Sequence, residues 1–177
     1  LSACQTYDFE RVTPFTVSQV TDEHIVASRQ LKPNMMLLVD NSFSMELPTD
    51  PLSAACPANC GKTASALCPP GCSTRVSELK VALGDFLSRQ ATVGRFGLTK
   101  FPQPVENQPC HPASNIDQPL PAPTPNDEGT DAALVSSADA VNRVIQTLRP
   151  NGGTPTAASL DFVGSLSGLT DVNDGRA

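Results

Sequence analysis

Five consecutive apolar residues, Met35 to Val39, end on Asp40, and this run constrains the fold more than any other feature of the sequence. A strand with one solvated face alternates apolar and polar residues, so an unbroken apolar run predicts a strand that is covered on both faces of a parallel sheet. The segment RFGLTKF (95–101) predicts a second buried strand. Two parallel strands need a long crossover connection, which a helix commonly supplies.

The sequence between and after these strands predicts that crossover and two further helices. Apolar residues at helical spacing indicate a helix over 74–90, with Ser73 or Thr74 as its N-cap, and another over 136–148. A third helix is expected over 155–167, with Thr154 in the N-cap region and Pro155 at the first helical position. The order strand, helix, strand implies a right-handed crossover. The predicted fold class is therefore α/β, with a doubly wound, mostly parallel sheet flanked by helices.

Two further short strands and two insertions complete the predicted organisation. IVAS (25–28) is strand-like, and ASNIDQPL (113–120) suits an edge strand because proline is tolerated there. Many of the 17 prolines lie within 48–70 and 102–125, which predicts irregular insertions over about 45–73 and 102–130. The net charge is −6 with no run of Lys and Arg, so nucleic acid is not an expected partner. The sequence also has no apolar run of the roughly 20 residues that a membrane helix needs.

The cysteines indicate an oxidising compartment. Six are present, and four of them lie in the first insertion as Cys56-x3-Cys60 and Cys68-x3-Cys72. Four thiolates are one way to hold zinc, but zinc cysteines usually stand two residues apart rather than three. Disulfides among these four cysteines and Cys110 are the favoured interpretation, because exported chains oxidise cysteines in loop-rich segments.

The first four residues, LSAC, resemble the cleavage box of bacterial lipoproteins. The resemblance implies that Cys4 carries acyl chains and that residues 1–32 form the box and a tether. The alternative is a disulfide between Cys4 and Cys110. Acylation would attach the protein to a membrane through its lipid anchor alone, in the bacterial envelope, at the outer membrane or cell surface. Envelope proteins are then possible partners.

Asp40, Ser42 and Ser44 lie at alternate positions directly after the first strand. Ligands of open α/β sheets bind beyond the carboxyl ends of the strands, so these side chains stand where a site is expected. A carboxylate and two hydroxyls are hard oxygen ligands, suited to Mg²⁺, Mn²⁺ or Ca²⁺ and poor for zinc. Thr154, in the GGTPT turn, offers a further hydroxyl from another connection.

These residues carry a family resemblance. DNSFSM resembles the first element, and GGTPT the second, of the metal-ion-dependent adhesion site of von Willebrand factor A domains, and the resemblance covers about residues 33–177. It implies that Ser42, Ser44 and Thr154 bind the cation directly and that Asp40 binds it directly or through water. The alternative is that Asp40 and Ser42 only cap a turn and that Thr154 only caps a helix.

The chain departs from the family pattern in two ways. Phe43 stands where many members have glycine, so a large ring is expected beside the cation. The family's third element is an aspartate after the next buried strand, and Asp171 and Asp174 have no such strand before them. They are interpreted as turn residues, and the remainder of the domain is expected after Ala177.

Other chemistries find little support in the sequence. Gly61-Lys62-Thr63 resembles the end of a phosphate-binding loop, but position 56 is cysteine where that motif needs glycine. No GxSxG elbow surrounds Ser42 or Ser44, and His24 and His111 are interpreted as polar surface residues, so no enzyme is proposed.

Two classes of function remain. The first is a surface adhesion module in which a carboxylate from a protein or surface ligand completes the coordination of the cation. The second is a structural envelope lipoprotein in which the metal only stabilises loops. Anchored A-type domains with cysteine-rich insertions resemble bacterial surface adhesins, including lipoproteins proposed to couple gliding machinery to the substratum.

Overall fold

A two-stranded parallel sheet forms the centre of the protein. The computed structural model describes residues 32–63, 65–105, 107–122 and 131–171. Strand β1 (Asn34–Asp40) pairs with β2 (Arg95–Phe101) over their whole lengths, from Asn34 opposite Arg95 to Asp40 opposite Phe101. Both predicted strands are therefore confirmed, and their carboxyl ends lie at the same edge of the sheet.

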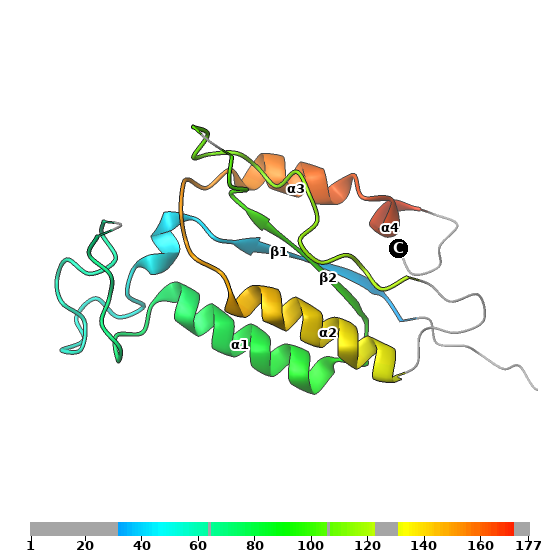
Figure 1. Cartoon of the computed structure of the whole chain (residues 1–177), viewed down its shortest axis with the longest axis horizontal. Helices are drawn as coiled ribbons and strands as arrows, with labels where there is room; N and C mark the ends of the chain where they lie inside the picture. The colour runs from blue at the N-terminus through cyan, green and yellow to red at the C-terminus, as the bar shows by residue number, and fades with distance from the viewer. Residues whose placement is uncertain (1–31, 64, 106, 123–130, 172–177) are drawn as a thin grey trace, which may run out of the picture.

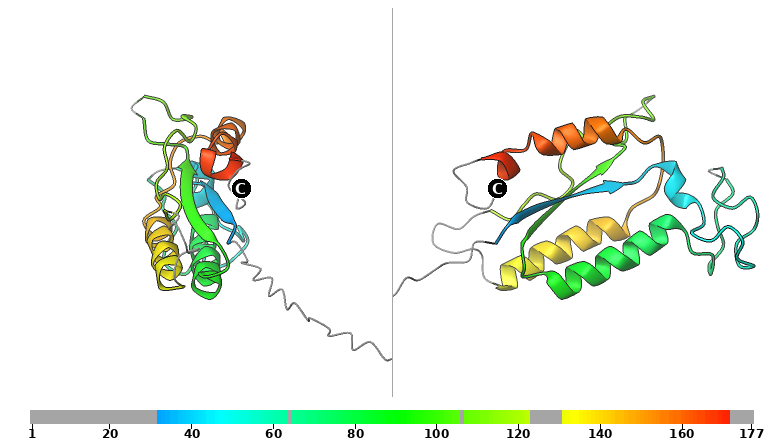
Figure 2. Two further views of the ribbon diagram at one scale, coloured as in Figure 1. Left: turned by 90° about the vertical axis from the view of Figure 1, so that its right-hand side faces the viewer. Right: turned by 180° about the vertical axis from the view of Figure 1, so that it is seen from behind.

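Helices cover both sides of this sheet (Figures 1 and 2). On one side lie α1 (Arg75–Gln90), which joins the two strands, and α2 (Asp131–Gln146). On the other lie α3 (Thr156–Gly164) and the single turn α4 (Ser167–Thr170), both of which contact β1. A 3₁₀ turn, η1 (Phe43–Glu46), follows β1 directly. The protein is thus a mixed α/β structure with a small parallel sheet packed against helices.

Helix α1 begins as the sequence predicts. The hydroxyl of Thr74 accepts a hydrogen bond from the Ser77 backbone N–H, and the Ser77 hydroxyl accepts one from the Thr74 N–H. This reciprocal capping box satisfies two N–H groups that have no partner inside the helix. Val76 and Leu87 are buried on the core side of α1, whereas Phe86 is 39% exposed and contacts Phe96 edge to face.

Helix α2 differs from the predicted 136–148 at both ends. It already includes Asp131, because Leu134 continues the buried face that runs through Ala138, Val141 and Ile145. It ends at Gln146, since the N–H groups of the next two residues bond to carbonyls only three residues back. Such tightening of the last turn is common at helix ends, and Pro150 prevents continuation.

The single helix expected over 155–167 is interrupted. Pro155 is the N-cap rather than the first helical residue, and the helix stops at Gly164. Both the N–H and the hydroxyl of Ser165 donate to the Phe162 carbonyl, and Leu166 is extended, so the chain leaves the helix before α4 begins. Glycine followed by a serine that bonds back to the backbone favours such a break.

Two expectations about the sheet need correction. The strand expected to be covered on both faces, β1, buries only Val39, whereas six of the seven residues of β2 are buried. In the described residues β1 pairs with a strand on one side only, which leaves its other edge partly accessible. Residues 113–120 form no strand but make one antiparallel bridge, between Leu98 and Gln118, that covers the outer edge of β2. The expected strand at 25–28 lies outside the described residues.

Candidate metal site at the carboxyl edge of the sheet

The loop after β1 brings three of the four predicted ligands together. The Ser42 backbone N–H donates to Oδ1 of Asp40 at 2.7 Å, which fixes the carboxylate against the turn. The hydroxyl oxygens of Ser42 and Ser44 lie 3.1 Å apart. No recorded hydrogen bond within the described residues engages Oδ2 of Asp40. The two hydroxyls are therefore neighbours, and the carboxylate is held against the same turn.

A second segment crosses this loop and approaches it through the backbone. The Asn151 N–H donates to the Asn41 carbonyl at 2.9 Å, and the Phe43 N–H donates to the Gly152 carbonyl at 3.0 Å. Asn41 also binds β2, because its N–H donates to the Phe101 carbonyl at 2.7 Å. These bonds hold residues 151–152 against the exit of β1, and Thr154 follows two residues later.

Gly152 is required for this crossing. It has φ +75°, a left-handed conformation that favours glycine, and a Cβ there would lie 2.3 Å from the Pro109 carbonyl oxygen. The close approach of the two backbones depends on the missing side chain. Gly152 therefore links the 102–110 loop, the loop after β1 and the segment that carries Thr154.

The four predicted ligands differ in exposure. Ser42 is fully buried, Asp40 and Ser44 are partly buried, and Thr154 is exposed. The proposed capping role of Thr154 is wrong, because the N-cap of α3 is Pro155 and no side chain caps that helix. The capping role of Asp40 is present, since its carboxylate accepts the Ser42 N–H. This contact occupies one oxygen and is compatible with metal binding through the other.

The chemistry of these donors fits a small hard cation. Two ligands at neighbouring corners of an octahedral Mg²⁺ site with bonds of about 2.1 Å stand about 3.0 Å apart. The separation of the Ser42 and Ser44 hydroxyl oxygens, 3.1 Å, is close to this value and is also that of an ordinary hydrogen bond. Within the described residues, Asp40 belongs to no group of three or more acidic, His or Cys side chains. The set thus provides a single negative charge.

Asp171 does not supply a second carboxylate to this set. It follows α4, whose Gly168 carbonyl accepts a hydrogen bond from the side chain of Asn34, the first residue of β1. Asn34 and Asp40 stand at opposite ends of a strand that is about 20 Å long at 3.3 Å per residue. Asp174 lies outside the described residues.

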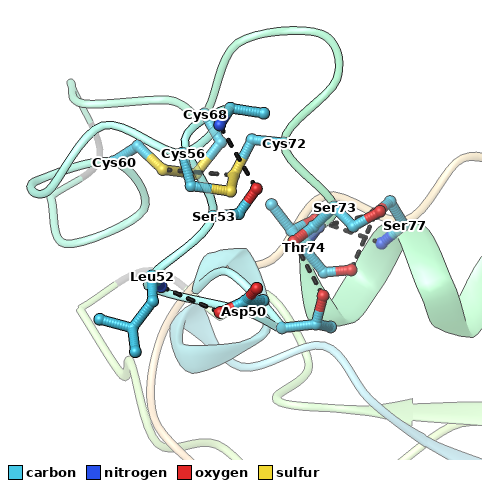
Figure 3. The surroundings of a disulfide bond; sticks show 12 residues. Asp50, Leu52, Ser53, Cys56, Cys60, Cys68, Cys72, Ser73, Thr74 and Ser77 are labelled. Atoms are coloured by element: carbon cyan, nitrogen blue, oxygen red, sulfur yellow. Dashed lines mark hydrogen bonds between the residues drawn. A yellow bond between two sulfur atoms is a disulfide. The ribbon is translucent and has the colours of Figure 1, made fainter.

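The cysteine-rich insertion lies at the same edge of the sheet, beyond η1 (Figure 1). Disulfides join Cys56 to Cys72 and Cys60 to Cys68, and the Sγ atoms of Cys60 and Cys72 lie only 3.6 Å apart (Figure 3). Cys60, Cys68 and Cys72 are the one close group of three or more His, Cys, Asp or Glu side chains within the described residues, but their sulfurs are oxidised. Thiolate is the form of cysteine that binds metal.

The prediction that Cys110 forms a disulfide with the insertion is wrong. The four cysteines of the insertion pair with one another, and Cys110 is a free, exposed thiol within the described residues. It lies beside the glycine turn instead, where a Cβ on Gly153 would come within 2.4 Å of its Sγ. The proposed lipid attachment at Cys4 lies outside the described residues.

The insertion contacts the loop after β1 through its backbone. A Cβ on Gly61 would lie 2.2 Å from the carbonyl oxygen of Glu46, the last residue of η1. The segments that enter and leave the insertion are joined by a hydrogen bond from the Thr49 N–H to the Ser73 carbonyl at 3.0 Å. The disulfide cluster is therefore placed next to η1 and the start of α1.

Positive charge gathers behind this edge. The Lys80 ammonium donates to the Leu148 carbonyl at 3.0 Å. Burial lowers the pKa of Lys80 below its ordinary value, the neighbouring Arg149 lowers it further, and Glu46 acts in the opposite direction. Lys80 and Arg149 thus share a region in which a negative charge would be favoured.

Asn41 is a residue of this site that the sequence analysis did not single out. Its side-chain amide donates to the Arg149 carbonyl at 3.0 Å, and the residue is 7% exposed. Its position in the sequence could have indicated this. Side chains alternate along an extended backbone, so the residue between Asp40 and Ser42 faces away from the side that those two residues share.

No helix in the described part of the chain is long and apolar enough to cross a bilayer. Comparison of the chain with protein-family models, curated proteins and solved structures finds no match.

Proposed function

We propose that this chain is a surface adhesion module that holds a divalent cation, Mg²⁺, Mn²⁺ or Ca²⁺, and binds a carboxylate of its partner through that cation. The ligands are Asp40, Ser42, Ser44 and Thr154. We further propose that its fold is that of a doubly wound, von Willebrand factor A-like domain. Its location is the bacterial envelope, with a lipid anchor at Cys4.

One observation carries the proposal. The two short motifs that suggested the metal site are separated by 107 positions, from Met45 to Gly152, yet the backbone bonds between 41–43 and 151–152 bring them to one edge of the sheet. The side chains at this edge are hard oxygen donors, and they do not form a pair of general base and nucleophile. Hard donors suit a cation whose remaining positions are filled by water or by a partner's oxygen.

Incomplete charge at the site also supports partner binding. Asp40 supplies one negative charge against the two positive charges of the ion, so a carboxylate from outside would be attracted to the remaining positive charge. The protein as a whole carries −6, and without the ion it should repel acidic surfaces. Cation-dependent attachment to a carboxylate surface is therefore a specific expectation.

Retention of the protein on carboxylate-coated beads tests this proposal. We expect retention in Mg²⁺ that EDTA abolishes and that Asp40→Asn abolishes. Asp139→Asn is the matched control, since Asp139 is exposed on α2 and removes the same charge away from the site. Retention that survives both EDTA and Asp40→Asn would refute an adhesion site of this kind. Mg²⁺ that stabilises the fold without promoting retention would instead favour a structural envelope protein.

A further inference from the structure

A hollow of about 400 Å³ opens beside the loop that follows β1, and Asn41 of that loop lines it. Its walls come from the end of β2 and the following loop, from the end of α2, and from residues 149, 151 and 152. This volume lies within the range of small-ligand sites, and Asn41 and Gly152 belong to both the hollow and the crossing described above. The two features are therefore contiguous.

The charges that line the hollow are positive. Lys100 and Arg149 contribute to its wall, and no acidic residue among the described part of the chain does. Lys100 forms a salt bridge with Asp117, which lies behind the wall, whereas the Arg149 side chain bonds only to the Leu148 carbonyl at 3.1 Å within the described residues. In a protein with a net charge of −6, a hollow that offers a guanidinium with no ion-pair partner among the described residues is suited to an anion.

A buried acceptor without a partner provides an independent indication of a ligand. The Asn41 side chain is more than nine-tenths buried and lines the hollow, and its Oδ1 is the one buried side-chain polar atom without a hydrogen bond in the described residues. A flipped amide would set two oxygens against each other, because Nδ2 donates to the Arg149 carbonyl. Within the described residues Oδ1 has no donor, so a water molecule or a ligand group is needed to supply its hydrogen bond.

We propose that the partner is a peptide segment with two acidic side chains. The carboxylate of the first completes the coordination of the cation, and this hollow receives the second. The second carboxylate pairs with Arg149, and a backbone N–H of the segment donates to Oδ1 of Asn41. This inference rests on the proposed function, and it defines the partner as an acidic peptide rather than as any surface that presents carboxylates.

The remaining wall favours a peptide over an acidic polysaccharide. Pro102, Pro104 and Val105 line one side of the hollow, and Val144 and Leu148 line the other. The aliphatic stem of a glutamate can pack on such a surface without losing hydrogen bonds. A sugar ring would have to remove several hydroxyls from water, which carries a free-energy cost where they find no partner.

Peptide arrays provide the test. Alanine- and glycine-based peptides would carry one glutamate, or two glutamates separated by up to about four residues, which span about 13 Å of extended chain. The full chain would be applied as wild type, as Arg149→Gln and as Arg143→Gln. Arg143 is exposed on α2 outside the hollow, so its replacement makes the same charge change elsewhere.

In Mg²⁺ we expect the best two-acid peptide to bind wild type about threefold to tenfold more tightly than one-acid peptides do, a modest gain because Arg149 is exposed. Arg149→Gln should remove this gain and leave one-acid binding unchanged, and Arg143→Gln should keep it. Absence of the gain in wild type, or its persistence in Arg149→Gln, would overturn the inference while leaving Mg²⁺-dependent one-acid binding, and hence the proposed function, intact.

Two further outcomes separate the hypotheses. A gain that depends on Arg149 together with one-acid binding that is insensitive to EDTA would support the hollow and refute the metal-dependent function. Retention on polygalacturonate that depends on Arg149, with no two-acid gain on the arrays, would show that the hollow takes a sugar acid and that the peptide assignment is wrong.

Discussion

Replacing Gly152 with alanine should disturb the fold and the cation site together. The backbone there has φ +75°, and an added Cβ would lie 2.3 Å from the Pro109 carbonyl oxygen and 2.9 Å from Cγ of Pro102. A non-glycine residue in the left-handed region costs about 1–2 kcal/mol, and the contact with backbone at 2.3 Å adds to this because the carbonyl cannot move alone. We expect the free energy of unfolding to fall by about 2–4 kcal/mol.

The effect on the site follows from where the chain must move. The segment that shifts carries the Gly152 carbonyl, which accepts from Phe43, and leads to Thr154 two residues later. Displacing it should weaken Mn²⁺ binding about tenfold or more, because ligand geometry at a metal site tolerates little error. Thermal unfolding followed by circular dichroism and calorimetric titration with Mn²⁺ measure the two effects on the same samples.

Two other glycines serve as controls for this prediction. Gly71 has φ +98° with no atom within 4 Å of an added Cβ, so Gly71→Ala tests the backbone conformation without the collision. Gly164, at the end of α3, has neither feature, so Gly164→Ala should be neutral or slightly stabilising. The reasoning fails if Gly152→Ala is no more destabilising than Gly71→Ala, or if it unfolds more easily yet binds Mn²⁺ as wild type does.

Three more predictions concern the core, the insertion and a partly buried lysine. Ile145→Ala should destabilise by about 2–5 kcal/mol in urea unfolding, since Ile145 is fully buried, whereas Leu160→Ala at a 57% exposed position should change stability by less than about 0.5 kcal/mol. Non-reducing peptide mapping should recover the two disulfides of the insertion and an alkylated Cys110, and replacing the four paired cysteines with serine should weaken partner binding far more than Mn²⁺ binding. Because folding holds the pKa of Lys80 below 10.5, the unfolded chain binds more protons between the two values, so stability should rise with pH in that window and the rise should be smaller in Lys80→Met.

The sequence predicted the two strands and the first helix well because each has an unambiguous local signal. An unbroken apolar run and RFGLTKF marked β1 and β2, and Thr74 followed by Ser77 supplied the cap of α1. The relative burial of the strands was not predictable from composition, because it depends on what pairs with each edge. Residues 113–120 cover the outer edge of β2 through a single bridge, a tertiary contact that has no local pattern.

The site was predictable in part for similar reasons. The spacing of Asp40, Ser42 and Ser44 placed them together, whereas the approach of the 151–152 segment depends on backbone bonds between residues far apart in the sequence. The disulfide pairing depends on how the insertion folds back on itself, which cysteine spacing leaves open, and this is why Cys110 was wrongly assigned.

The most direct test of the account is calorimetric titration of the protein with Mn²⁺, compared among wild type, Asp40→Asn and Asp139→Asn. The account predicts one Mn²⁺ per chain, with affinity unchanged in Asp139→Asn. Asp40→Asn should weaken binding by at least about 100-fold, because Asp40 is the one charged ligand of the proposed set and losing even an outer-shell partner costs about 10–100-fold. Equal Mn²⁺ affinity in wild type and Asp40→Asn, or no binding to folded wild type, would contradict the metal site.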